Sequence, residues 1–232
     1  MDQHQFHSSR RAFVLGAGAT SLAMMLPSAA HAQLSCGSGG LSSLLGKATD
    51  SALDKLAKPG TYYNDKEIRI GLPIVGKKSG GLLGDILSVG NKLGVLDGLT
   101  RKINDAAGVA AGEAKPIFRD AIDNLSFSDA PGIIRESDGG TQYLRRSSND
   151  TLHSKLEPLV DGALESAGVY KQFDGLAEKH SFIRAAGLNR ESINRSVTDQ
   201  GLDGIFAYVG TEERAFRKNP LKGIGGVLSD IL

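Results

Sequence analysis

The sequence predicts an all-α protein, a single helical bundle of about seven short to medium helices with one short extended segment near 67–72. Beyond residue 40, apolar residues recur three and four positions apart along most of the chain, which is the helical period. Strand-like alternation of polar and apolar residues appears in one short run only. The 30 glycines predict frequent breaks between helices, because each interior glycine costs about 1 kcal/mol relative to alanine.

The first predicted helix follows a Gly/Ser linker at residues 33–40 and ends near Pro59. Its apolar positions are Leu41, Leu44, Leu45, Ala48, Ala52, Leu53 and Leu56. The alternating segment Glu67–Leu72 then runs up to Pro73. Since no second strand is available to pair with it, we expect an extended arm laid across helices.

Glycine-interrupted amphipathic pieces fill the middle of the chain, with apolar residues at Leu83, Ile86, Leu87, Leu93, Leu96, Leu99, Ile103, Ala106 and Ala110. A clear apolar stripe follows between Ala114 and Leu125. Ser128 and Asp129 have the composition of a helix N-cap, so a short turn of helix is expected through Ile134.

The second half of the chain predicts two longer helices. One extends from about Thr141 to Ala167, with Pro158 expected to kink it and Gly168 to end it. A short segment with Tyr170, Phe173 and Leu176 leads to the last strong helix, from about Arg190 to Arg217. The chain finishes in an apolar tail that carries Leu221, Ile224, Val227, Leu228, Ile231 and Leu232.

Residues 1–32 have the features of a twin-arginine (Tat) export signal. Arg10 and Arg11 precede a mildly apolar run, and Ala30 and Ala32 supply the small-x-small pattern recognised by a signal peptidase. A membrane anchor is the alternative, but the apolar run falls short of the ~20 residues that span a bilayer. We therefore expect export to the periplasm, with residues 41–232 forming a single domain.

Cys36 raises the separate possibility of a lipid-modified N-terminus. A lipobox has an aliphatic residue three positions before the cysteine, and Gln33 occupies that position. Lipoprotein anchoring at Cys36 is therefore not expected.

The composition after residue 32 argues against several classes of partner. That part of the chain has zero formal net charge, so neither nucleic acid nor anionic lipid is an expected partner. A single cysteine and two separated histidines form no metal-ligand pattern, and no cofactor or metal is expected. No integral membrane segment is expected after processing, and the oligomeric state is open.

The catalytic motifs that we tested fail on specific residues. Gly71–Lys77 follows a strand-like run as a phosphate-binding loop would, but Lys78 stands where Ser or Thr must hold magnesium. No nucleophile elbow is present. Asp120 and Asp123 lie off the apolar stripe of their helix, as expected for a solvated face. We assign no catalytic residue.

A candidate polar end of the bundle emerges when the apolar stripes are extended. The stripe of the 141–167 helix turns polar toward Tyr143, Arg145 and Ser148, and the stripe of the last helix passes over Glu212, with Glu213 at its edge. Because an isolated buried charge is costly, we expect Arg145 to meet one of these glutamates at an end that borders a ligand pocket. The alternative is a structural ion pair that fixes helix register.

Several separated motifs resemble the bacterial family catalogued as domain of unknown function 4197, from about Leu41 to the C-terminus. They are Glu113–Phe118, Asp120–Ile122, Phe127-x-Asp129-Ala130, Thr141-x-Tyr143-Leu144-Arg145, Leu202–Phe206, Glu212-Glu213 and Arg217-x-Asn219-Pro220. Two departures concern packing: Leu144 stands where phenylalanine is usual, and Ser147-Ser148 where threonine is common. The resemblance implies an exported helical domain and supplies no activity.

Three functional hypotheses follow. The first is a non-catalytic envelope module that binds an apolar or amphiphilic small molecule, or a partner protein, in a groove between helices. The second is a structural or assembly role in which the apolar tail contacts another chain. The third is an enzyme of unrecognised type that uses a carboxylate at the polar end.

Overall fold

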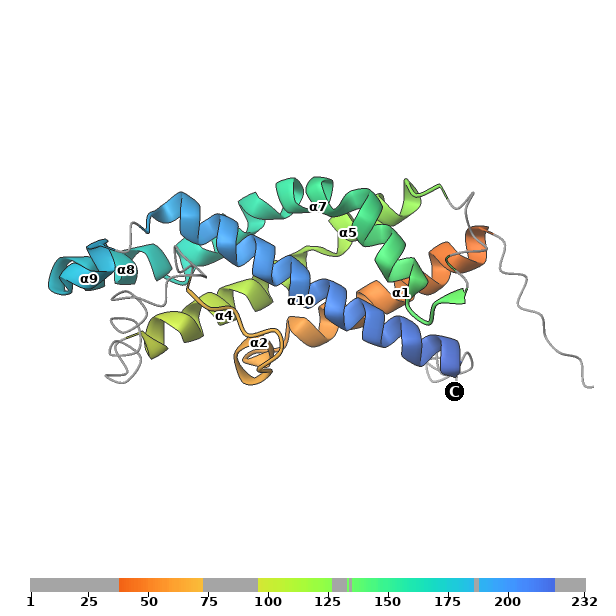
Figure 1. Cartoon of the computed structure of the whole chain (residues 1–232), viewed down its shortest axis with the longest axis horizontal. Helices are drawn as coiled ribbons and strands as arrows, with labels where there is room; N and C mark the ends of the chain where they lie inside the picture. Colours follow the sequence, from red (N-terminus) through yellow and green to blue (C-terminus); the bar gives the residue numbers. More distant parts are fainter. Residues whose placement is uncertain (1–37, 73–95, 127–132, 134, 186–187, 220–232) are drawn as a thin grey trace, which may run out of the picture. The chain divides into compact units, whose positions relative to one another are not determined.

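The computed structural model describes residues 38–72, 96–126, 133, 135–185 and 188–219, and these residues contain helices and no strand (Figure 1). The helices are α1 (Ser38–Leu56), α2 (Thr61–Asn64), α4 (Asp97–Glu113), α5 (Lys115–Asp123), α7 (Gly139–Ser166), α8 (Val169–Lys179), α9 (Ser181–Ala185) and α10 (Arg190–Lys218). The predicted all-α class is confirmed. The predicted helical piece around 83–93, most of the turn through Ile134 and the apolar tail lie outside the described residues.

Helix α10 is the element around which the others pack, with α1 and α7 lying along it (Figure 1). α7 and α10 run antiparallel, because the start of each helix contacts the end of the other. The polar pairs between them follow one another in reverse order: Thr141–Glu213, Arg145–Asp203, His153–Asp199, Glu157–Asn194 and Asp161–Arg190.

Every described helix contributes to one hydrophobic core. Leu53 of α1, Ile103 of α4, Leu152 of α7 and Val197 of α10 are completely buried in it. The ring of Phe118 on α5 packs edge-to-face against the ring of Phe206 on α10, with 6.1 Å between the ring centroids. This shared core explains how short, glycine-interrupted helices that would be marginal alone are stabilised together.

The extended segment after α2 lies against helices, as predicted. Ile68 and Ile70 are buried in the core. The side-chain amide of Asn104 accepts a hydrogen bond from the N–H of Ile70 and donates one to the carbonyl of Ile70, both at 2.9 Å. The side-chain amide of Gln200 makes the same pair of hydrogen bonds with Gly71, both at 3.0 Å. Two amide side chains therefore take the place of a neighbouring strand, which satisfies a backbone that would otherwise be buried without partners.

Local sequence explains where the long helices begin and end. Gly168 has a φ of +68°, the left-handed conformation that favours glycine, and it follows the last turn of α7 as predicted. Asn189 starts α10 with a capping box, in which its side chain accepts from the N–H of Ser192 at 2.8 Å. Pro158 lies inside α7. Among the described residues, no helix is both long and apolar enough to cross a membrane.

Candidate functional site

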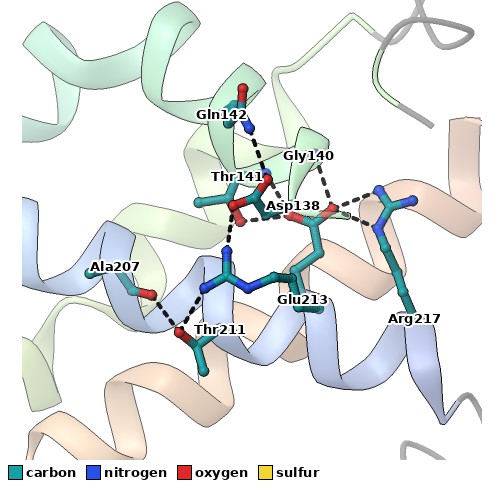
Figure 2. A network of polar contacts seen from close by, with 9 residues as sticks. Asp138, Gly140, Thr141, Gln142, Ala207, Thr211, Glu213 and Arg217 are labelled. Atoms are coloured by element: carbon teal, nitrogen blue, oxygen red, sulfur yellow. Dashed lines mark hydrogen bonds and ion pairs between the residues drawn. The ribbon is translucent and has the colours of Figure 1, made fainter. Parts of the chain in front are cut away.

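A buried carboxylate joins the last part of α10 to the first turn of α7. Glu213 is completely buried and accepts from the N–H of Gly140 at 3.0 Å and from the N–H and hydroxyl of Thr141, both at 2.7 Å (Figure 2). Arg217, one turn later on α10, donates to the same carboxylate at 2.6 Å. The first N–H groups of a helix have no partner within the helix and favour negative charge, so Glu213 caps α7 from outside.

We call Asp138, Gly140, Thr141, Glu213 and Arg217 the α7–α10 junction. Its glycine is required by the close approach of the carboxylate. A Cβ on Gly140 would stand 2.8 Å from Oε1 of Glu213, closer than ordinary van der Waals contact. The preceding Gly139 is equally constrained, since a Cβ there would stand 2.1 Å from the carbonyl oxygen of Ile133.

The rim of the junction adds a second set of contacts (Figure 2). Arg214 forms an ion pair with Asp138, which also accepts from the side chain of Gln142 at 2.8 Å. Arg214 further donates to the hydroxyl of Thr211 at 3.1 Å. These side chains are partly exposed, so each contributes less than the buried contacts of Glu213.

Glu212 and Glu213 are adjacent in sequence and bind different helices. Glu212 accepts from the hydroxyl of Ser51 at 2.7 Å and pairs with the ammonium of Lys55, both on α1. Successive residues of a helix point about 100° apart, which lets the pair face two neighbours at once. The glutamates thus fasten α10 to α1 and to α7.

The prediction that Arg145 meets Glu212 or Glu213 is wrong. Arg145 is half-exposed, pairs with Asp203 of α10 and lies 5.3 Å from the ring centroid of Phe206. The antiparallel register explains the error: Glu213 lies opposite the very start of α7, so a residue one turn further along faces an earlier turn of α10.

The other predicted residues of the polar end have separate surroundings. Tyr143 is half-buried, and its hydroxyl donates to the carbonyl of Ser126 at 2.5 Å. Ser148 is half-buried further along α7. Whether these residues border a ligand pocket stays a prediction.

Sequence reasoning missed the residues that receive the glutamate, Gly140 and Thr141, together with Arg217. A signal for them was present. A Gly-Gly-Thr sequence at a helix start leaves room for a carboxylate, and a glutamate four residues before an arginine has the spacing of a helical ion pair.

The α7–α10 junction is a structural contact, in which both oxygens of the Glu213 carboxylate already accept hydrogen bonds. Oε1 of Glu213 accepts from Gly140 and Arg217, and Oε2 accepts from both donors of Thr141. With both the Nε and a terminal nitrogen of Arg217 donating to Oε1, the carboxylate accepts five hydrogen bonds, all of them from groups that hold α7 and α10 together.

Other titratable groups are shifted by contacts that hold helices together. Hydrogen bonds from Arg190 and from the hydroxyl of Tyr170 lower the pKa of Asp161, in a cluster that ties α7 and α8 to the start of α10. Burial, followed by a hydrogen bond to Asp65, raises the pKa of Tyr208 to about 12. Within the described part of the chain, no group of three or more His, Cys, Asp or Glu residues is placed to hold a metal ion.

An apolar groove lies between α4 and α7. We call it the α4/α7 groove; its volume is about 520 Å³, and it is lined by Asp105, Ala106, Val109, Glu113, Pro158, Leu159, Gly162, Ala163, Ser166 and Ala167. Val109 is 57% exposed there, and it is the one large hydrophobic residue that is exposed in the described structure. The volume falls within the range of roughly 300–1,000 Å³ that is usual for ligand sites.

Most residues of the α7 wall of this groove are small: Gly162, Ala163, Ser166 and Ala167 line it beside Pro158 and Leu159. At Gly162, a Cβ atom would meet nothing within 4 Å, so the packing of the fold does not require a glycine there. Its missing side chain leaves the groove open.

Three charged side chains of α4 lie in or next to the groove. Among the described residues that line the groove, Asp105 and Glu113 are acidic and none is basic. Lys102 lies just beyond the Ala167 end, with its Nζ 3.8 Å from where a Cβ on Gly168 would stand. The α4 side of the groove therefore carries a carboxylate at each end, Glu113 at one and Asp105 at the other, and Lys102 lies beyond Asp105.

Together, the fold and the junction define an all-α protein in which a buried carboxylate fastens its two longest helices. The chain belongs to the family described as Protein of unknown function (DUF4197), whose model matches residues 33–232. This confirms the family resemblance found in the sequence. No curated protein and no solved structure matches the chain.

Proposed function

We propose that this protein is a non-catalytic binding module of the bacterial envelope that takes an apolar or amphiphilic chain into the α4/α7 groove. The observation that carries the proposal is the exposed Val109 in an apolar groove with an open α7 wall. When a ligand or partner covers an exposed hydrophobic residue in a concave surface, apolar area is removed from water and the free energy of the complex is lowered.

The junction supports a binding role over a catalytic one. Glu213 is the most buried carboxylate of the described structure, and its oxygens are saturated by structural donors. The groove offers apolar surface and two carboxylates about 12 Å apart along α4, a distance worked from the eight residues that separate Asp105 and Glu113. That arrangement favours recognition of a chain over chemistry on one atom.

The envelope location rests on residues 1–32 as a Tat signal. Replacing both Arg10 and Arg11 by lysine should leave the uncleaved precursor in the cytoplasm, because the translocon requires the arginine pair. Cell fractionation with an antibody against the folded domain measures the result. Normal processing and export of the double variant would contradict the Tat assignment.

The binding proposal is tested by native mass spectrometry of the protein purified gently from its own envelope. We expect a reproducible extra mass on the wild-type protein that disappears on denaturation. Gly162→Leu places a large side chain on the α7 wall of the groove, where its Cβ meets nothing within 4 Å, and should remove that mass. Gly175→Leu, on α8, is the matched control, because a Cβ there also meets nothing within 4 Å. An extra mass that survives Gly162→Leu would contradict the groove as the binding surface.

An assembly role is the second candidate, and one observation favours it. The chain ends in the apolar segment from Leu221 to Leu232, directly after the charged end of α10. An apolar segment of this kind is stabilised by contact with another apolar surface.

A further inference from the structure

We infer that the α4/α7 groove binds one amphipathic helix of a partner protein, and that this helix carries two basic residues eight positions apart with an apolar residue midway between them. The inference rests on the proposed function, because it names the chemistry of the chain that the groove takes. It follows from the spacing of three residues on α4, from the small residues of α7 and from the charges around the groove.

The α4 side of the groove is a row of three side chains, each one turn from the next. Asp105, Val109 and Glu113 follow one another at intervals of four residues, and all three line the groove. Residues four apart are neighbours on a helix surface and together form a ridge. The ridge therefore presents a carboxylate, an exposed hydrophobic side chain and a second carboxylate, with about 12 Å between the first and the last along the helix axis.

A second helix has the geometry that matches this ridge. When two helices pack with their rows of every fourth residue interdigitated, the rows lie side by side and advance by the same rise, about 6 Å per step. A partner row of basic, apolar and basic residues then places one positive group beside each carboxylate. Its apolar residue covers Val109, which removes the exposed apolar area from water.

The opposite wall of the groove leaves room for the backbone of such a helix. Gly162, Ala163, Ser166 and Ala167 line the α7 side, and the distance between packed helices is shortest where the side chains at the contact are small. A site for a small molecule encloses most of its ligand, whereas Val109 remains 57% exposed at the α4 side. The groove is therefore suited to a chain that lies across it.

The charges of α4 favour a cationic partner. Every charged residue that the structure places in the lining is acidic. Lys115, two residues after Glu113, already pairs with Asp54 of α1 at 2.6 Å. Lys102 lies about one turn before Asp105, outside the groove, and partly offsets that carboxylate. Glu113 should therefore contribute more to the affinity for a cation than Asp105 does.

The charges of α7 beside the groove have the same sign. Asp161 and Glu165, each next in sequence to a residue of the wall, share one guanidinium, that of Arg190, at 2.9 and 2.6 Å. Two carboxylates and one cation leave a net negative charge on this flank. An acidic helix would meet like charge on both sides of the groove, which opposes binding.

The test measures the binding of three synthetic peptides to the purified protein by fluorescence anisotropy at low salt. Each is a capped amphipathic helix of about 16 residues, near the length at which isolated helices become stable. The dilysine peptide has two lysines eight positions apart with leucine midway; the diglutamate peptide has glutamates in their place; the shifted peptide has the same composition as the first with its lysines on the opposite face. We expect the dilysine peptide to bind about tenfold or more tightly than either of the others. Equal affinities for the dilysine and shifted peptides would overturn the inference, as would no binding of the dilysine peptide.

Variants of the two carboxylates test whether the charges meet. Both side chains are exposed, so their replacement leaves the core intact. Glu113→Gln should weaken the dilysine peptide about fivefold and Asp105→Asn about twofold, while Glu136→Gln, exposed ahead of α7, should change nothing. The double variant Asp105→Lys/Glu113→Lys should prefer the diglutamate peptide. A double variant that keeps the wild-type preference would overturn the inference.

Gly162→Leu separates this inference from the proposed function. It should abolish binding of the dilysine peptide, whereas Gly175→Leu should leave binding unchanged. If all three peptides bound equally well and Gly162→Leu abolished all binding, the cationic helix would be rejected and the groove would remain an apolar binding surface. Binding that is unaffected by Gly162→Leu would reject both. Tighter binding of dodecylammonium than of the dilysine peptide would reject a helix as the occupant and leave the proposed function standing.

Discussion

Replacing Glu213 by glutamine should destabilise the fold more than any other single charge removal on α10. Glutamine keeps the size of the side chain but turns one of its two acceptors into a donor. In the structure, both oxygens face donors at 2.6–3.0 Å, from Gly140, Thr141 and Arg217. At least two of those donors therefore lose their acceptor whichever way the amide is turned.

The magnitude follows from burial. Breaking a buried pair by removing one partner costs about 3–5 kcal/mol. Arg217 keeps 18% exposure and can be partly hydrated after the change, so the lower end applies, about 3 kcal/mol. With a urea m-value of roughly 2 kcal/mol/M, the unfolding midpoint should fall by about 1.5 M.

The assay is urea unfolding followed by far-UV circular dichroism, with two comparison variants. Glu212→Gln should cost only about 1 kcal/mol, because Lys55 is 49% exposed. Glu191→Gln, exposed in the first turn of α10, should stay within about 0.5 kcal/mol of wild type. Equal costs for Glu213→Gln and Glu212→Gln would refute the account of the junction.

Three further predictions concern stability. Gly140→Ala should cost about 2 kcal/mol in urea unfolding, since its Cβ displaces a buried carboxylate, and wild-type stability would contradict the close approach. Asn104→Ala leaves the backbone of Ile70 without its partners; it should cost about 3 kcal/mol and speed tryptic cleavage at the neighbouring Arg69, whereas an unchanged cleavage rate would argue against the amide contacts. Asp161→Asn should destabilise at pH 7, and its difference from wild type should shrink as the pH falls below about 4, because a lowered carboxyl pKa stabilises the fold only above that range. A pH-independent difference in thermal melts would contradict that last prediction.

The helices were predictable from the sequence because their signals are local. The 3.6-residue period of buried residues located α4, α5, α7 and α10, and a glycine in the left-handed conformation ended α7 as expected. The arm at 67–72 was also predictable, since one strand without a partner must find other acceptors. That Asn104 and Gln200 supply them could not be inferred, because it depends on which helix faces lie beneath the arm.

The junction could be predicted only in part, for a related reason. A charge on an apolar stripe indicates a buried partner, and that reasoning pointed to Glu212, with Glu213 at the edge of the stripe. Both are buried, and Glu213, the one at the edge, is completely buried. The identity of the partner depends on the register between α7 and α10, which is set by packing along both helices. Arg145 was therefore assigned to the wrong turn. The α4/α7 groove was equally hidden, since it arises from two helices whose exposed faces look ordinary separately.

The central claim, that the α4/α7 groove binds an apolar chain, is tested most directly by photo-crosslinking in living cells. A photoreactive phenylalanine analogue replaces Val109 in the groove and, as a control, the exposed Ala207 on α10. The account predicts a covalent adduct from position 109 and none from position 207, with its mass identifying a small amphiphile or a partner protein. No adduct at position 109, or equal adducts at both positions, would contradict it.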